Sequence, residues 1–355
     1  MGSVINIFSP NWETQDSYGR IALELKKGFE AKGYHVNPFG DNAPITVLQP
    51  AWGGLFLGYP TLYKDFERQI LFAEFGQRVA ITMFESTKLL DGWTENLNRC
   101  AAVIVPAQFL VNVFRSNCVK APLHVLPLGV SSEFISKPRL RTLSPKRPLT
   151  FLAIADRGAR KAWDKALFAF EEAFGDDMRY KLILKSRKPS FSIANPNIEQ
   201  IGRDMSNEQL AKLYRRADVM IFPSCGEGFG LPPREFAATG GIALATNWGG
   251  TADALQMWGV ELPFKLETAW RDNRKWYGKQ GQWANVNQNE LVAKLRRVAD
   301  YFDNFAEDAM KAAKFVAEQY QWSCFVDGVE TVWQAAIKPQ KPIEIKEVQY
   351  AIAGD

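Results

Sequence analysis

The sequence has few of the side chains that build metal sites and disulfide frameworks. Among 355 residues it contains two histidines, His35 and His124, which are too few for a histidine-based metal site or for histidine-rich catalysis. Its four cysteines lie far apart, and none forms the C-x-x-C spacing of zinc and redox motifs. We therefore expect no disulfide framework, no bound metal and a reducing compartment.

Long apolar runs and blocks of like charge are also missing. No run reaches the roughly 18–20 apolar residues that a membrane-spanning helix needs. The segment Met1–Asn6 has neither the pattern of a secretory signal nor the Ser or Thr that N-myristoylation needs at its last position. The formal net charge of +4 includes no long basic block that could form a nucleic-acid-binding arm. These absences predict a soluble, cytoplasmic protein.

Short apolar runs typical of strands alternate with amphipathic patterns typical of helices. Val4–Phe8 is the first such run, and a helix is expected from Ser17 to a stop at Gly33. Further strands are expected at 46–48, 79–84, 102–105, 124–126, 149–155, 180–184, 219–222 and 242–245, and further helices at 108–115, 162–174, after a capping box at 206–209, and within 291–302 and 305–320. The alternation predicts an α/β fold with parallel sheets, and the strand signal fades after Asp253.

The chain length predicts two domains, because single hydrophobic cores stop growing at about 250–300 residues. A polar, proline-bearing stretch at 136–148 reads as the linker between them. We expect an N-terminal Rossmann-like domain at 1–140 and a C-terminal one at 149–320, with a helix and tail at 321–355 returning to the first domain. Two such domains face each other across a cleft, and folds of this kind bind ligands at the carboxyl ends of their strands.

The most specific segment for function is Pro223–Glu235, which joins a buried strand to a helix. Gly228 and Gly230 allow a ligand to approach the backbone, and the helix N-terminus suits a phosphate or a sugar. Glu227 and Glu235 supply carboxylates that accept hydrogen bonds from paired hydroxyls. The alternative is an ordinary glycine-rich turn with a solvated Glu235.

The spacing of Glu227 and Glu235 in EGFGLPPRE resembles the signature of glycosyltransferase family 4, whose enzymes have the GT-B fold. The resemblance continues through Gly240–Thr246 and Gly249–Asp253 and includes shorter stretches at 84–87, 105–106 and 127–130. It implies a retaining transferase that uses a nucleotide diphosphate sugar. It also implies that Glu235 holds the ribose and that Glu227 contacts the donor sugar. The backbone N–H groups of Gly228, Phe229, Gly230 and Leu231 would lie near the sugar and phosphates.

Three cations follow the strand at 149–155, namely Arg157, Arg160 and Lys161. Arg and Lys beside a helix N-terminus can bind a diphosphate, and the turn is similar to the "R-K-G" loop of the same family, with Ala162 in place of the glycine. Either arginine could supply the guanidinium, and a solvated basic turn is the alternative reading. Because fixed cations can stabilise the leaving diphosphate and no D-x-D pair is present, no metal is expected.

Two residues of the N-terminal half complete the predicted site. Gly19 stands at a helix start in the loop 11–20, which in the family faces the donor diphosphate, so we assign it to donor binding; Arg20 beside it could add positive charge. Glu85 stands where many relatives carry a histidine that contacts the transferred sugar. It could orient the acceptor or stabilise positive charge at the sugar carbon, or it could simply cap a helix.

Other residues carry weaker signals. Lys185 and Arg187 follow a strand and could border the base pocket, although surface charges are the simpler interpretation. The run Ala51–Pro60 is apolar, aromatic and glycine-rich; it could be an acceptor platform or a partner patch, and packing is its default role. Cys225 has no evident base partner, which argues against a nucleophile.

The reaction itself has competing interpretations. A nicotinamide-dependent oxidoreductase would need G-x-G-x-x-G in the first strand–helix turn, and residues 11–20 lack it. A catalytically silent module that binds sugar nucleotides remains a rival. The sequence does not distinguish among acceptors: a glycan, a protein side chain, a lipid-linked sugar or, as in phage-type enzymes, a modified DNA base. The donor and the oligomeric state are equally open.

Overall fold

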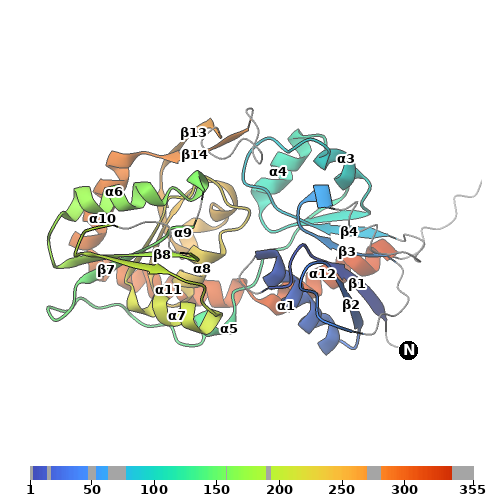
Figure 1. Ribbon diagram of the computed structural model, residues 1–355, viewed down its shortest axis with the longest axis horizontal. Coiled ribbons are helices and arrows are strands. Elements are labelled where there is room, and N and C mark those ends of the chain that lie inside the picture. Colours follow the sequence, from blue (N-terminus) through green and yellow to red (C-terminus); the bar gives the residue numbers. More distant parts are fainter. Residues whose placement is uncertain are drawn as a thin grey trace, which may run out of the picture.

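The computed structural model describes residues 3–13, 17–46, 53–62, 77–156, 158–188, 193–269 and 281–337. These residues form two α/β domains that lie side by side, with the N-terminal half in blue and cyan and the C-terminal half in green to orange (Figure 1). Each domain has a six-stranded sheet in which every strand pairing is parallel. The predicted α/β fold with two parallel-sheet domains is confirmed.

The N-terminal sheet has the strand order β2-β1-β3-β4-β5-β6. Its strands are β1 (Val4–Phe8), β2 (His35–Phe39), β3 (Gly54–Leu57), β4 (Arg78–Ile81), β5 (Ala102–Val105) and β6 (Leu123–Val125). Its helices are α1 (Ser17–Ala31), the 3-10 turn η1 (Pro60–Leu62), α3 (Trp93–Asn98), α4 (Gln108–Ser116) and α5 (Ser132–Ile135). The central strands β3 and β5 are buried along their whole length, as expected for a sheet covered on both faces.

The C-terminal sheet has the order β12-β11-β10-β7-β8-β9. Its strands are β7 (Leu149–Ile154), β8 (Tyr180–Ser186), β9 (Ile198–Gly202), β10 (Val219–Phe222), β11 (Ile242–Thr246) and β12 (Val260–Leu262), and β13 (Phe264–Thr268) and β14 (Gln282–Val286) form a separate antiparallel hairpin. Its helices are η2 (Ala159–Lys161), α6 (Trp163–Phe174), α7 (Asn207–Arg216), α8 (Leu231–Ala238), η3 (Gly249–Thr251), α9 (Leu255–Trp258), α10 (Gln288–Asp300) and α11 (Phe302–Gln319). If β7 is taken as the first strand of this domain, the sheet has the same strand order as a dinucleotide-binding fold.

Helix α12 (Trp322–Ile337) follows the C-terminal domain but packs against the N-terminal one (Figure 1). Gly28 of α1 has no side chain, and a Cβ there would collide with Val326. Lys32 forms ion pairs with Asp327 and Glu330 at 2.7 and 2.8 Å. The tail after residue 337 lies outside the described residues.

Several local predictions were wrong. Strand β2 was missed because its asparagine and proline break the apolar pattern, and β9 was missed because its middle residues are polar. Strand β3 was also missed; it lies within the glycine-rich run 51–60, for which no strand was predicted. Strands also continue beyond Asp253, in β12 and the β13–β14 hairpin, where exposed polar residues interrupt the apolar pattern. Strand β4 ends at Ile81, three residues before the predicted end. The strand expected at 46–48 falls largely outside the described residues. The capping box at 206–209 is confirmed, with reciprocal hydrogen bonds between Ser206 and Gln209.

Candidate active site

The C-terminal sheet reverses its winding direction between β7 and β10, which are neighbours in space but not in sequence. In open α/β sheets the crevice at such a switch point is the usual ligand site. The turn after β7 holds Arg160 and Lys161, and the turn after β10 holds Gly226–Gly230. Two hydrogen bonds join the turns: the Arg160 carbonyl accepts one from the Cys225 N–H at 2.7 Å and one from the Ser224 hydroxyl at 3.2 Å.

Glu227 is the centre of a buried charged cluster in this crevice. Its Oε1 accepts hydrogen bonds from Lys161 Nζ at 2.7 Å and from the Ser224 hydroxyl at 2.6 Å, and it lies 3.1 Å from Arg160 Nη1. Burial alone would raise the pKa of Glu227, but Lys161 and Arg160, together with the hydrogen bonds from Lys161 and Ser224, lower that pKa to about 2. Glu227 is therefore an ionised hydrogen-bond acceptor at neutral pH.

The N-terminal domain meets this cluster through the segment after β4. Arg160 Nη2 lies 3.8 Å from Glu85 Oε1, and the Glu85 side chain is largely buried. Gly226 packs against the Glu85 carbonyl and Gly228 against the Met83 side chain, at positions where a Cβ would collide. Glu85, Arg160, Lys161 and Glu227 thus form one group that spans both domains.

The β13–β14 hairpin holds the same segment from the other side. The Thr87 N–H and the Ser86 hydroxyl donate hydrogen bonds to the Gln282 carbonyl at 3.2 and 3.1 Å. The Gln282 N–H donates in return to the Thr87 hydroxyl at 2.9 Å. Further along the interface, Asp253 accepts a hydrogen bond from the Gln108 N–H at 2.7 Å. These contacts fix the position of Glu85 relative to the C-terminal domain.

The loop 227–230 is held by Arg234, a residue that the sequence analysis did not assign. Its fully buried guanidinium donates hydrogen bonds to the carbonyls of Phe229, Gly230, Gly250 and Asp253. It also stacks on aromatic rings, with Cζ 4.1, 4.5 and 5.1 Å from the ring centroids of Phe229, Trp258 and Tyr320. Phe229 therefore points into the core, and only its backbone can face a ligand.

Local backbone geometry explains two motif positions. Gly230 has φ +83° and precedes α8, whose first turn contains Pro232 and Pro233. Ala162, which stands in place of the family's glycine, has φ +46° and precedes α6. This left-handed conformation strains a residue that has a Cβ. The backbone at Ala162 therefore adopts a conformation that a glycine would adopt without strain.

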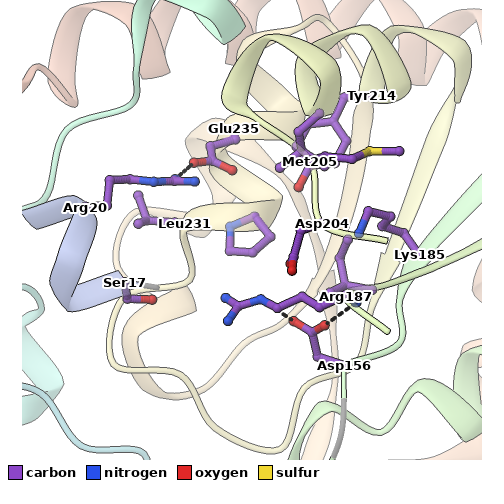
Figure 2. Close-up of a pocket in the computed structure, with 13 residues that line it drawn as sticks. Ser17, Arg20, Asp156, Lys185, Arg187, Asp204, Met205, Tyr214, Leu231 and Glu235 are labelled. Atoms are coloured by element: carbon purple, nitrogen blue, oxygen red, sulfur yellow. Dashed lines mark hydrogen bonds and ion pairs between the residues drawn. The ribbon is translucent and has the colours of Figure 1, made fainter. Parts of the chain in front are cut away.

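Glu235 faces a separate pocket at the interface, shown in Figure 2. It is buried and forms an ion pair with Arg20 of α1. Burial raises the pKa of Glu235, and Arg20 acts against that increase. Leu231 and Pro232 of α8 line the pocket together with Ser17 and Tyr214. Gly19 lies beside Arg20 in α1, and a Cβ there would collide with the Glu13 carbonyl, so its packing requires glycine.

Lys185 and Arg187 line the same pocket, as Figure 2 shows. Lys185 is buried at the end of β8, and its ammonium donates to the Ser186 and Arg203 carbonyls at 2.6 and 2.7 Å, so it is no surface charge. Arg187 is half-exposed and pairs with Asp156 at 4.0 Å. Burial lowers the pKa of Lys185.

The structure thus gathers the predicted site residues into two neighbouring groups. Glu85, Arg160, Lys161 and Glu227 form the charged cluster, and Leu231 and Glu235 line the pocket with Arg20. Gly228, Phe229 and Gly230 connect the two groups along the chain. Arg157 lies outside the described residues, as does part of the run 51–60.

No role was predicted for Ser224 or Asn207, and Arg20 was predicted only to add positive charge. Ser224 directly follows the proline that ends β10, and Asn207 begins α7. The residue pattern of a single segment does not predict contacts between elements that are distant in the chain. Within the described ranges, no group of three His, Cys, Asp or Glu side chains is placed to hold a metal ion, and no helix is long and apolar enough to cross a membrane.

Comparison with known proteins agrees with this geometry. Residues 192–265, which include the turn after β10, match the family model "Glycosyl transferases group 1". No curated protein matches the sequence significantly.

Solved structures match the fold over nearly the whole chain. A sucrose-phosphate synthase from Thermosynechococcus elongatus has a TM-score of 0.70 at 14% identity, covering 94% of this chain and 98% of its own. A glycosyltransferase from Rickettsia africae has a TM-score of 0.70 at 13% identity, covering 96% and 100%. Anabaena HepE, solved with UDP and glucose, has a TM-score of 0.68 at 11% identity, covering 94% and 100%. This chain therefore has the GT-B fold, and residues 192–265 of its C-terminal domain are similar to the glycosyl transferases group 1 family.

Proposed function

We propose that the protein transfers a sugar from a nucleotide diphosphate sugar to an acceptor hydroxyl, with retention of anomeric configuration as in glycosyltransferase family 4. The observation that carries the proposal is the charged cluster at the switch point of the C-terminal sheet. There Lys161 and Arg160 form ion pairs with Glu227, and Arg160 also faces Glu85 of the other domain. The group 1 match at 192–265, a range that includes Glu227, supports the proposal.

A uridine diphosphate hexose is the first donor to test. Anabaena HepE has been solved with UDP-glucose, and an Escherichia coli protein of trehalose-6-phosphate synthesis has been solved with UDP-2-fluoro-glucose. In our chain the nucleoside would occupy the pocket of Figure 2, with the ribose hydroxyls on Glu235. The diphosphate would then lie toward Arg160 and Lys161.

The chemical step breaks the bond between the anomeric carbon and the diphosphate oxygen and forms a bond from that carbon to the acceptor oxygen. Negative charge grows on the departing diphosphate, and Lys161 and Arg160 stabilise it together with backbone N–H groups at the start of α8. The acceptor proton passes to a phosphate oxygen of the leaving group, on the same face of the sugar. We expect the fixed cations to suffice without a metal ion, so that activity persists in EDTA.

Glu227 serves recognition in this scheme. With a pKa of about 2, it cannot donate a proton at neutral pH. The three polar contacts described above all involve Oε1, so we expect Oε2 to accept a hydroxyl of the donor sugar. Glu85, on the opposite wall, would orient the acceptor or stabilise positive charge at the anomeric carbon.

The test is a donor screen with two readouts. Thermal shift detects binding because a ligand of the folded state raises the melting temperature, and release of nucleotide measures turnover. UDP-glucose, GDP-mannose and ADP-glucose would be compared, first alone and then with glycan, peptide and modified-DNA acceptors. We expect one donor to bind and to be consumed.

Variants complete the test. Lys161→Ala and Glu235→Ala should each weaken binding or turnover at least tenfold, because each removes a charged contact with the donor. Lys212→Ala is the matched control, since Lys212 is exposed on α7 and, among the described residues, forms an ion pair only with Glu208 in the preceding turn of the helix. Binding without turnover of any donor would favour the silent module. A DNA acceptor would reveal itself by salt-sensitive duplex binding.

A further inference from the structure

Arg20 reaches from the N-terminal domain into the nucleotide pocket of the C-terminal domain. Figure 2 shows its side chain entering from α1 and pointing at Glu235 of α8. Its Nη1 forms an ion pair with Glu235 Oε1, and its Nη2 donates to Asn207 Oδ1 at 3.0 Å. Asn207 in turn donates to the Ser131 hydroxyl at 3.4 Å. Arg20 is thus fixed by two elements of the opposite domain.

The pair lies in a poorly hydrated place. The Glu235 side chain is 2% exposed and the Arg20 side chain 14% exposed. The Nε of Arg20 is buried and has no hydrogen-bond partner among the described residues. Burying the Arg20 guanidinium leaves its Nε–H without a hydrogen bond, which is unfavourable. The interaction of Arg20 with Glu235 must compensate for this lost hydrogen bond.

Burial alone would push Glu235 toward its neutral form. Among the charged groups around it, Arg20 on α1 lowers the pKa of Glu235, whereas Glu133 on α5 raises it. Tyr214 on α7 also lies beside the pair and is itself buried. Asp156, Lys185, Arg187 and Asp204 line the more distant walls of the pocket. Arg20 is therefore the cation that opposes protonation of Glu235.

The protonation state decides what Glu235 can bind. An ionised carboxylate accepts hydrogen bonds at both oxygens, whereas a protonated carboxyl donates from one of them and loses acceptor capacity. With Oε1 on Arg20, the ionised group can still accept at Oε2 and at the second lone pair of Oε1. Two neighbouring ribose hydroxyls need this acceptor capacity.

We propose that Arg20 is a positioning residue that keeps Glu235 ionised and oriented to accept the ribose hydroxyls of the donor, so that the N-terminal domain contributes to nucleotide affinity. The proposal rests on the proposed function, because it takes Glu235 as the ribose-binding residue. It assigns Arg20 no contact with the reacting atoms. Its consequence is that the affinity of one domain for the nucleotide depends on a side chain of the other.

The experiment measures UDP-glucose binding by isothermal titration calorimetry at pH 6.0 and pH 8.0. The diphosphate of UDP-glucose is a diester and lacks the second ionisation of a phosphate monoester at about pH 6, so a pH effect reports on the protein. The variants are Arg20→Met, Arg20→Lys, Glu235→Gln and the double variant of Arg20→Met with Glu235→Gln. Lys26→Met is the matched control, because Lys26 lies on the same helix and, within the described part of the chain, forms an ion pair only with Glu30.

We expect wild type and Lys26→Met to bind equally at both pH values. Arg20→Met should weaken binding roughly tenfold at pH 8.0 and more at pH 6.0, because Glu235 then takes up a proton more readily. Arg20→Lys should restore much of the affinity. In the Glu235→Gln background, Arg20→Met should change the affinity by less than about twofold, because its effect passes through Glu235.

Three results would overturn the proposal. One is an Arg20→Met variant that binds within twofold of wild type at both pH values. Another is an equal loss from Arg20→Met in the presence and absence of the Glu235 carboxylate, which would mean that Arg20 contacts the donor directly. If Arg20→Met fails to fold, the charge-free double variant and Arg20→Lys carry the same comparison. Wild-type protein that binds none of UDP-glucose, GDP-mannose and ADP-glucose would instead refute the proposed function and this inference with it.

Discussion

Lys161 and Glu227 form a close, largely buried ion pair, with side chains 14% and 9% exposed. The pKa of Glu227 falls from 4.5 to about 2, which corresponds to about 3 kcal/mol in favour of its ionised form. Lys161 is the largest of the attractive contributions. We predict that Lys161→Met and Glu227→Gln each destabilise the protein by about 2 kcal/mol, because each leaves a desolvated charge with fewer partners.

The double variant distinguishes a real interaction from two unrelated losses. Removing both charges leaves neither partner stranded, so its destabilisation should be smaller than the sum of the single effects by about 1–2 kcal/mol. Thermal unfolding followed by tryptophan fluorescence measures this, because about 1 kcal/mol shifts the midpoint by roughly 2–4 °C in a domain of this size. Lys212→Met, which removes an exposed pair, should change stability by less than about 0.5 kcal/mol. Single effects that add within about 0.5 kcal/mol would show that Lys161 and Glu227 do not interact in solution.

Three further predictions concern the same region. Because the pKa of Glu227 is depressed in the folded state, its contribution to folding stability is fully present above pH 4.5 and is lost as pH falls toward about 2. In urea unfolding, the stability of wild type should therefore fall more steeply with acid than that of Glu227→Gln, and parallel declines in stability would contradict the assignment. Ala162→Gly should leave the melting temperature nearly unchanged, since relief of the left-handed backbone strain offsets the lost methyl group and the added chain entropy. Ala166→Gly inside α6 should instead lower the free energy of unfolding by about 2 kcal/mol, and equal losses of stability in the two variants would refute the strain argument. Arg234→Met should lower stability by roughly 3 kcal/mol or more in thermal unfolding, because several buried carbonyls lose their donor, and a neutral effect would contradict this.

Periodicity and turn chemistry predicted the two-domain α/β architecture because strongly apolar strands such as β5 and β10 carry their own signal. Periodicity did not predict β2 and β13, which are strands because they pair with β1 and β14 and not because of their own apolar pattern. The pairing of β2 with β1 tolerates a proline because β2 lies at the edge of its sheet. Local sequence cannot encode that neighbour.

The same limit applies to the site. The motif around Glu227 was visible because its residues are contiguous in the chain, and Lys161 was visible because cations follow a strand. The partner of Glu235 could not be foreseen, since Arg20 lies 215 residues away and belongs to the other domain. Arg234 was hidden for another reason: an arginine in an amphipathic turn is ordinarily assumed to face solvent, and its aromatic surroundings come from three separate segments.

Helix α12 has a consequence for synthesis of the chain. Helix α12 covers α1 and part of the N-terminal sheet, and both leave the ribosome long before α12 does. The whole C-terminal domain is synthesised in between. That later domain is contiguous from β7 to α11, so it can finish folding first, while the earlier one waits with an apolar flank uncovered. We predict that a released chain truncated before Trp322 is digested by protease in residues 1–140 and resists it in residues 149–320; the reverse pattern would refute this dependence of the N-terminal domain on α12.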